Sequence, residues 1–333
     1  MNIAFFEVQL WKQEYLNKQL KGHTLLFFEE ALSEDNVEKV KSCEVISVFI
    51  HSKITEEILT LLPNLKFIAT QSTGFDHIDV AACTARKIAV SNVPYYGENT
   101  VAEHTFALIL ALSRNVHKSY VRTLQGNYAI DGLMGFDLQG KTLGVIGTGH
   151  IGLHVIRIAK GFGMHVVAYD VKEDPFLAEV LRFKYVPLEE VATSADIISL
   201  HLPYNAATHH IINGNILAKV KPGALIINTS RGSLIDSNAL LTALDAKRVG
   251  GAALDVLEGE ELILDEKQLL HYKQPNEKLE ELAKNHILLK RDNVVFTPHI
   301  AFFSKEALER ILSTTAENIL AFAKGEMNNI ISA

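Results

Sequence analysis

Cysteine and tryptophan are scarce in this chain. Its 333 residues include two cysteines, Cys43 and Cys83, and a single tryptophan, Trp11. Both cysteines lie in or beside apolar segments, which is typical of reduced residues packed in a core rather than of a disulfide or a metal pair. The sequence is therefore unlike that of a small disulfide-stabilised protein, and we expect hydrophobic burial to hold its fold together.

An excess of basic charge and long apolar runs are also lacking. The 32 lysines and arginines are outnumbered by 39 acidic residues, for a formal net charge of −7, and they form no basic block. Nucleic acid is therefore not an expected partner. No apolar stretch reaches the ~20 residues of a membrane span, and residues 1–7 lack the basic region of a signal peptide. We expect a cytoplasmic protein with no membrane contact, long enough for two domains.

Apolar runs alternate with amphipathic helical patterns along the chain. In the first third, the runs indicate buried strands at 3–8, 24–28, 45–50, 65–70 and 88–93, with helical patterns at 34–41 and 55–62. A long helix is predicted over 98–124, and further strands at 142–146, 166–169, 196–200, 224–228, 251–256 and 294–296. Strands that alternate with helices indicate parallel sheets covered on both faces. We therefore predict an α/β protein.

A glycine-rich turn follows the strand at 142–146 and opens a predicted helix at 151–162. It reads Gly147-Thr148-Gly149-His150-Ile151-Gly152. Gly147 permits the tight turn, Gly149 lets a pyrophosphate approach the backbone, and Gly152 lets the helix pack closely on the strand. The helix N-terminus adds N–H groups and a favourable dipole. This pattern predicts a dinucleotide site.

Asp170 ends the next strand, about where a ribose-binding acid belongs. Its carboxylate can accept both adenosine ribose hydroxyls and would repel a 2′-phosphate, although Lys172 nearby weakens that repulsion. We therefore predict NAD rather than NADP as the cofactor.

Three polar residues stand at the ends of later apolar runs: Arg231, Glu260 and His299. An arginine can bind a carboxylate through two parallel hydrogen bonds and keeps its charge. A histidine can carry a proton near neutral pH, and an acid can orient it. Together they supply what hydride transfer to a 2-oxo acid requires.

The order and wording of these segments closely resemble the D-2-hydroxyacid dehydrogenases. The ending His299-Ile300-Ala301-Phe302-Phe303 resembles the branch that acts on D-lactate. The resemblance implies an NAD-dependent oxidoreductase that interconverts pyruvate and D-lactate. Arg231 would bind the substrate carboxylate, His299 would act as acid and base, and Glu260 would orient His299.

The resemblance also implies further contacts. On the cofactor side, beside the glycine turn with His150 and Ile151, these are Leu202, Pro203, Thr208, Thr229, Ser230, Arg231 and Asp255. For Asp255 the alternative is a strand-end cap. On the substrate side they are Phe49, Thr73, Gly74, Tyr96, Arg231, His299 and Phe302. Phe49, Tyr96 and Phe302 would surround the C3 side of the substrate and leave room for a methyl group, unless Phe49 is simply core.

The implied architecture is a Rossmann NAD-binding domain, 98–299, inserted into a discontinuous flavodoxin-like α/β substrate domain, 1–97 and 300–333. The family usually forms homodimers through its NAD domains, and 98–124 would carry that contact. Residues 261–291 are rich in charge, and a solvated loop and helix is expected there. Among the other histidines, His23, His117 and His154 lack an acidic or cysteine partner at metal-ligand spacing, and the pair His209-His210 is not a ligand arrangement on its own, so no metal is expected.

Several alternatives remain open. The substrate could be a larger D-2-hydroxy acid, or glyoxylate or glycerate. A different class is an NAD-sensing binding protein, like the related transcriptional corepressors, which typically carry a tryptophan soon after the catalytic histidine. This chain has Phe302 there. A formate dehydrogenase is disfavoured because that branch lacks an acid at the position of Glu260.

Overall fold

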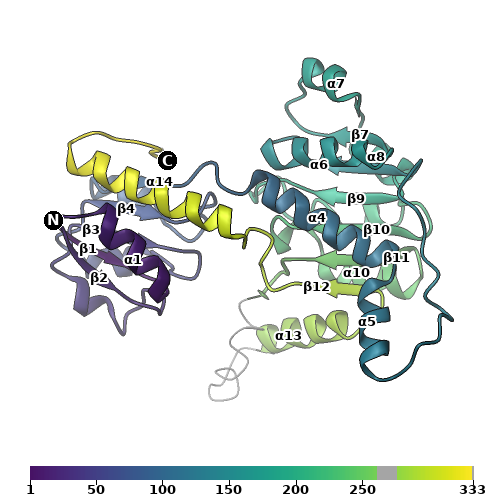
Figure 1. Cartoon of the computed structure of the whole chain (residues 1–333), viewed down its shortest axis with the longest axis horizontal. Coiled ribbons are helices and arrows are strands. Elements are labelled where there is room, and N and C mark those ends of the chain that lie inside the picture. Colours follow the sequence, from purple (N-terminus) through teal and green to yellow (C-terminus); the bar gives the residue numbers. More distant parts are fainter. Residues whose placement is uncertain (261–275, 332–333) are drawn as a thin grey trace. The chain divides into compact units, whose positions relative to one another are not determined.

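The computed structural model describes residues 1–260 and 276–331. It divides into two compact units, one formed by Met1–Tyr96 with Phe303–Ala333 and the other by Gly97–Phe302 (Figure 1). The expected loop and helix at 261–291 lies partly outside the described residues. Within the part that is described, Asn276–Leu289 forms helix α13.

The first unit is built on a five-stranded parallel sheet. Its strands are β1 (Asn2–Phe5), β2 (Thr24–Phe27), β3 (Val45–Val48), β4 (Phe67–Thr70) and β5 (Ala89–Ser91). Their order is β2-β1-β3-β4-β5, as in flavodoxin-like folds. The connecting helices are α1 (Leu10–Gln19), a 3₁₀ helix at Val37–Val40, α2 (Glu56–Thr60) and α3 (Val80–Ala85).

The last helix, α14 (Lys305–Ala323), belongs to this first unit. It lies beside α1 against the sheet (Figure 1). Ser304 caps its start by accepting a hydrogen bond from the Ala307 amide. Phe322 near its end stacks on Phe67 of β4, with ring centroids 4.5 Å apart. Apolar burial thus joins the two ends of the chain in one core.

The second unit contains a seven-stranded parallel sheet in the order β12-β11-β10-β9-β6-β7-β8. Its strands are β6 (Thr142–Ile146), β7 (His165–Tyr169), β8 (Lys184–Tyr185), β9 (Ile197–Leu200), β10 (Ala224–Asn228), β11 (Val249–Leu254) and β12 (Val294–Phe296). The sequence pattern missed β8 because two residues are too few to show a period.

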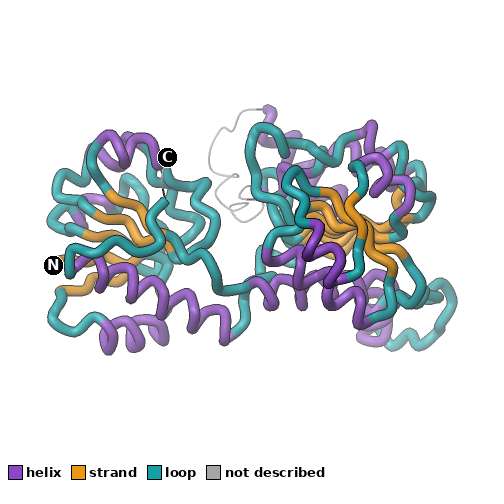
Figure 2. The backbone as a smooth tube through the Cα atoms, turned by 90° about the horizontal axis from the view of Figure 1, so that it is seen from above, coloured by secondary structure: helices purple, strands orange, loops and turns teal. Residues whose placement is uncertain are grey.

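Helices cover both faces of this sheet (Figure 2). On one face pack α4 (Glu98–Ser113) and α6 (His150–Gly161). On the other pack α8 (Leu188–Ser194), α9 (Gly214–Leu217) and α10 (Ser237–Asp245). A short helix, α7 (Pro175–Leu181), precedes β8, and a 3₁₀ turn at Gly232–Leu234 precedes α10. Each face has its own apolar core, so the prediction of an α/β class with a Rossmann domain is confirmed.

The prediction of a single helix over 98–124 is wrong. The helix ends at Ser113, and α5 (Val116–Leu124) begins after Asn115, which has a left-handed φ of 50°. The Ser113 carbonyl accepts the Phe136 amide instead of continuing the helical pattern. The Asn115 side chain donates to the Leu133 and Met134 carbonyls. Contacts from a distant segment therefore divide the helix.

None of the helices in the described residues is long and apolar enough to cross a membrane.

Candidate active site

Three predicted catalytic residues follow three adjacent strands of the second sheet. Asn228, Leu254 and Phe296 pair in register across β10, β11 and β12. Arg231, Glu260 and His299 come soon after these strand ends. Because parallel strands end at one edge of the sheet, all three segments emerge on the same side, where open α/β sheets bind their ligands.

His299 and Glu260 form a hydrogen-bonded pair. His299 Nδ1 lies 2.8 Å from Glu260 Oε1, and the other carboxylate oxygen accepts the Leu257 amide at 3.0 Å. A carboxylate can only accept, so Nδ1 carries a proton. Both side chains are about a quarter exposed. The ring is therefore held by an acid that is itself held by the backbone, and Nε2 lies on the side of the ring away from this hydrogen bond.

Asp255 anchors the loop that carries His299. Its carboxylate is fully buried and accepts hydrogen bonds from the Ile300 amide (3.0 Å), the Ala301 amide (2.8 Å) and the Thr297 hydroxyl. These contacts are what the strand-end cap interpretation requires. The cofactor contact that the resemblance implies for Asp255, with the carboxamide of the nicotinamide, would have to share this carboxylate with the three donors.

His104 also belongs to this network, although its sequence context in a helix gave no sign of it. Its Nε2 lies 3.0 Å from Thr297 Oγ1 and 3.5 Å from Asp255 Oδ1. Helix α4 thereby contacts the loop before His299. His104 and Thr297 are 193 residues apart in the sequence, so no local pattern could predict this contact.

Arg231 lies in a loop that packs tightly against the segment before Glu260. Its backbone carbonyl accepts the Asn228 side-chain amide at 2.8 Å. At the next residue, Gly232, an added Cβ would lie 2.0 Å from the Leu257 carbonyl carbon and 2.2 Å from the Glu258 nitrogen. Glycine is therefore required there, and the loops of Arg231 and Glu260 are positioned by each other.

The glycine turn lies where the strand order reverses, between β6 and β9. Gly147 has a φ of 99°, and a Cβ there would lie 2.5 Å from the His201 carbonyl oxygen. A Cβ on Gly152 would lie 2.0 Å from the Gly147 oxygen, whereas one on the exposed Gly149 would meet nothing within 4 Å. Two glycines thus serve close packing, and the third leaves the open backbone that a pyrophosphate needs, so these residues fit a dinucleotide.

Asp170 is held toward the glycine turn. Its carboxylate accepts the Thr148 amide (2.6 Å), the Thr148 hydroxyl (3.0 Å) and the Lys172 amide (3.0 Å). Burial acts to raise the pKa of this carboxyl, but these hydrogen bonds outweigh it and the pKa is lowered. Tyr185 of the unpredicted strand β8 supports the arrangement through a 2.9 Å contact with Thr148 Oγ1.

The remaining predicted cofactor residues lie at the same edge of the sheet. Leu202 and Pro203 follow β9, and Thr229 and Ser230 follow β10. Ser230 donates to the Leu200 carbonyl, and the Thr229 hydroxyl contacts that of Thr105. His150 is exposed and Ile151 half-buried at the start of α6. The Thr208 hydroxyl is engaged in its own turn, where it donates to the Pro203 carbonyl at 2.8 Å.

His201 is unsuited to acid–base chemistry. Burial lowers the pKa of its imidazole to about 3, and its Nε2 bonds Ser199 Oγ at 2.8 Å. The ring is therefore neutral at physiological pH.

Most of the predicted substrate residues lie in the first unit, each after a strand end. Phe49 follows β3, Thr73 and Gly74 follow β4, and Tyr96 follows β5. Phe49 is half-buried, and its amide donates to Glu7, whose carboxylate also accepts the His51 amide and the Ser52 hydroxyl. Phe302 lies in the second unit, edge-on to His299 with centroids 6.4 Å apart.

Known proteins match this chain along its whole length. Residues 106–301 match the D-isomer specific 2-hydroxyacid dehydrogenase NAD binding domain. A D-lactate dehydrogenase from Escherichia coli is 35% identical over 98% of both chains. A glyoxylate reductase from Thermococcus litoralis is also 35% identical, over 97% of this chain and 89% of its own.

Among solved structures, a D-lactate dehydrogenase from Aquifex aeolicus, complexed with NAD and lactic acid, is 36% identical and has a TM-score of 0.90. The match covers 100% of this chain and 99% of the other. Sequence, fold and the strand-end residues thus agree, and the chain belongs to the D-isomer specific 2-hydroxyacid dehydrogenases, with NAD as its cofactor.

Proposed function

We propose that this chain is a D-lactate dehydrogenase that interconverts pyruvate and D-lactate. The observation that carries the proposal is the 2.8 Å pair of His299 and Glu260 at the same sheet edge as Arg231. The E. coli and A. aeolicus relatives, both D-lactate dehydrogenases by name, support this substrate.

His299 handles the proton. Bound NADH would supply the hydride in pyruvate reduction, and NAD⁺ would accept it in D-lactate oxidation. With Nδ1–H donated to Glu260, His299 Nε2 gives a proton to the forming hydroxyl in pyruvate reduction and takes it back in D-lactate oxidation. The carboxylate of Glu260 stabilises the charged ring, and the Leu257 amide keeps that carboxylate from turning away.

Arg231 binds the substrate carboxylate. Its guanidinium presents two parallel N–H donors to a planar anion, a geometry that a lysine lacks. The tight packing at Gly232 sets the loop that carries it. We assign the amides of Thr73 and Gly74 in the first unit to the same carboxylate.

The cofactor is held by the glycine turn and its neighbours. Gly147, Gly149 and Gly152 shape the turn, and His150 and Ile151 open the helix whose N-terminus favours the pyrophosphate. Asp170, which the Thr148 amide and hydroxyl hold toward the glycine turn, would accept the ribose hydroxyls. Leu202, Pro203, Thr208, Thr229, Ser230 and Asp255 complete the set.

Three aromatic residues are proposed to limit the size of the substrate side chain: Phe49, Tyr96 and Phe302. Phe302 stands edge-on to the catalytic ring. Apolar fit discriminates by about 1–3 kcal/mol per methylene, so the preference for pyruvate is graded. Phe49→Leu is expected to move it toward longer 2-oxo acids.

The test is a panel of 2-oxo acids assayed with NADH. We expect the highest kcat/KM for pyruvate, with D-lactate as the product. A higher kcat/KM for 2-oxoisocaproate or phenylpyruvate would replace this proposal by one for larger substrates. Glyoxylate reduction is the second candidate, because the T. litoralis relative is equally identical to this chain; a higher value for glyoxylate would establish it.

We further propose a homodimer formed through the second unit. Apolar side chains of α5 and the segment after it are largely exposed: Val116, Tyr120, Val121, Leu124, Tyr128, Ile130 and Met134. Soluble monomers rarely expose so many neighbouring apolar side chains. A second copy of the chain is the occupant that this surface fits, since a symmetric dimer buries the same patch on both partners.

A further inference from the structure

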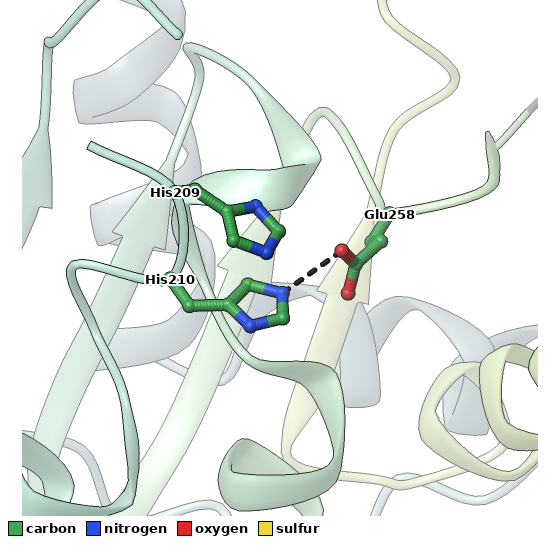
Figure 3. A group of neighbouring side chains, drawn as sticks. All are labelled: His209, His210 and Glu258. Atoms are coloured by element: carbon green, nitrogen blue, oxygen red, sulfur yellow. Dashed lines mark hydrogen bonds and ion pairs between the residues drawn. The ribbon is translucent and has the colours of Figure 1, made fainter. Parts of the chain in front are cut away.

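His209, His210 and Glu258 come together outside the residues assigned to the reaction. In sequence the adjacent pair is not a ligand arrangement on its own, and no metal was expected. The fold supplies the acid from 48 residues away, with His210 Nε2 2.9 Å from Glu258 Oε1 (Figure 3). The three residues can offer ligand atoms that all lie within 4.8 Å of one another.

The two histidine rings lie on the same side of the chain. Adjacent residues of an extended strand point to opposite faces, but here a turn ends at His210 with a left-handed φ of 49°. The rings therefore stack, with centroids 3.9 Å apart, and face Glu258 together (Figure 3). A left-handed histidine is uncommon, and such residues gather at ligand sites.

Two of the three side chains extend from a firmly held backbone. The His210 amide donates to the Ser233 carbonyl at 2.9 Å. The Glu258 carbonyl accepts from the buried Asn285 side chain at 2.9 Å, and Gly232 packs against the Glu258 nitrogen. His209 is exposed, so it can move toward the other two.

We propose that His209, His210 and Glu258 bind a divalent transition-metal ion of the zinc class. Two imidazoles and one carboxylate, with water in the fourth position, are a ligand set that Zn²⁺ and its neighbours accept. Metal bonds of about 2.0–2.2 Å require the donors to draw together, which rotation of His209 provides. The ion takes the place of the proton between His210 Nε2 and Glu258, and His210 binds it through Nε2 as a neutral ring that carries its proton on Nδ1.

A bound ion would join two loops beside the cofactor site. His209 and His210 directly follow Thr208, and Glu258 precedes Glu260 by two residues. The ion would therefore link the turn after β9 to the segment after β11 and stabilise the folded second unit, because it binds the native arrangement and not the unfolded chain.

The test is a titration of the untagged chain with Co²⁺, followed by calorimetry and by the visible absorption of the ion. We expect one ion per chain at submillimolar Co²⁺, and competition by Zn²⁺. His209→Ala and Glu258→Gln should each weaken binding at least about tenfold. His165→Ala, which removes another exposed histidine of this unit, is the matched control and should bind like the unmodified chain.

A second readout is the unfolding temperature. Zn²⁺ should raise it for the unmodified chain and for His165→Ala, and not for His209→Ala. His209 is exposed, so its replacement leaves the core intact, and glutamine at 258 still offers His210 an acceptor. Failure of the unmodified chain to bind Co²⁺, or equal affinity in His209→Ala, would show that the cluster is a simple hydrogen-bonded latch and overturn the proposal.

Discussion

The backbone at His299 takes a left-handed φ of 53°, a conformation that costs a non-glycine residue of order 1–3 kcal/mol. It persists because Asp255 holds the chain on both sides: its carbonyl accepts the His299 amide at 2.8 Å, and its carboxylate accepts the next two amides. The imidazole is thus aimed before any ligand arrives. Asp255 therefore positions the backbone of His299, in addition to the cofactor contact proposed for it.

Removal of the proton carrier should lower turnover more than affinity. We expect His299→Ala to reduce kcat by about 10²–10⁴-fold, the usual contribution of a positioned acid or base. Pre-steady-state and steady-state assays of pyruvate reduction measure this. His165→Ala is the control with unchanged kcat. An unaltered kcat in His299→Ala would remove this residue from the mechanism.

The pH profile should separate the role of Glu260 from that of His299. Glu260→Gln keeps an acceptor for Nδ1 but removes the negative charge that stabilises the imidazolium. Pyruvate reduction needs the charged ring, so the variant should lose more rate at neutral pH than at low pH. A uniform loss at all pH values would mean that Glu260 serves only to hold the loop.

Asp170 should set the choice of cofactor. Its lowered pKa keeps the carboxylate charged through the neutral range, and this charge repels a 2′-phosphate. Asp170→Ser should improve kcat/KM for NADPH and weaken use of NADH, more so with a basic residue beside it. Equal use of both cofactors by the unmodified chain would contradict the assignment.

His201 should make the fold sensitive to acid. Its folded pKa is about 3, below the ordinary 6.5, so the unfolded chain takes up a proton that the folded chain refuses. Its contribution to stability is complete above pH 6.5 and is lost as the pH falls toward 3. From pH 7 to 5 the loss is about 2 kcal/mol. In urea unfolding, the His201→Gln variant should lose less stability between pH 7 and 5 than the unmodified chain does. An equal loss of stability in both would mean that the buried ring does take up a proton in the folded chain.

At the scale of elements, the site depends on loops that pack against each other at strand ends. At Gly232 the loops of Arg231 and Glu260 pack so closely that an added Cβ would overlap the backbone of Leu257 and Glu258. Gly161, the last residue of α6, has open space where a Cβ would lie. Replacing each of these two glycines by alanine shows whether activity depends on close loop packing or on the backbone flexibility that any glycine gives.

Gly232→Ala should damage stability and activity together. Its Cβ would overlap backbone atoms, and overpacking of this kind typically costs about 1–3 kcal/mol. The backbone must shift, and Arg231 and Glu260 shift with it. Gly161→Ala should leave activity unchanged and raise stability by up to about 1 kcal/mol. Thermal unfolding and kcat/KM check both; a fully active Gly232→Ala would show that the loops tolerate displacement.

For the whole molecule, the exposed apolar side chains of α5 are the feature of the described residues that points to a partner. Tyr120 and Leu124 are 63% and 70% exposed. Burial of each such side chain in a dimer would contribute about 1.5–3 kcal/mol. Replacement of these apolar side chains in both copies should therefore shift the proposed dimer toward monomer.

The double variant Tyr120→Asp/Leu124→Lys should therefore elute as a monomer in size-exclusion chromatography with light scattering. Phe176→Asp, which alters a residue of α7 that is 71% exposed, is the control and should remain dimeric. A monomeric unmodified chain at micromolar concentration would rule out this interface.

The local sequence was enough to determine the fold class and most strands. Apolar runs at 142–146 and 224–228 are the strands β6 and β10 to the residue, because a buried parallel strand needs continuous apolar side chains whatever its neighbours are. The glycine turn was equally readable, since the positive φ of Gly147 and the close approach of Gly152 to Gly147 are local, although the contact of Gly147 with His201 is not.

Tertiary structure alone decided what depends on distant partners. Contacts between distant segments end the helix before Asn115, form the two-residue strand β8 and pack α14 against the first sheet. They also bring His104 close to Asp255 and Glu258 close to His210. Periodicity reports which face of an element is buried, but it carries no information about which element covers that face. Strand order and side-chain pairs separated by tens or hundreds of residues follow from packing of the whole chain.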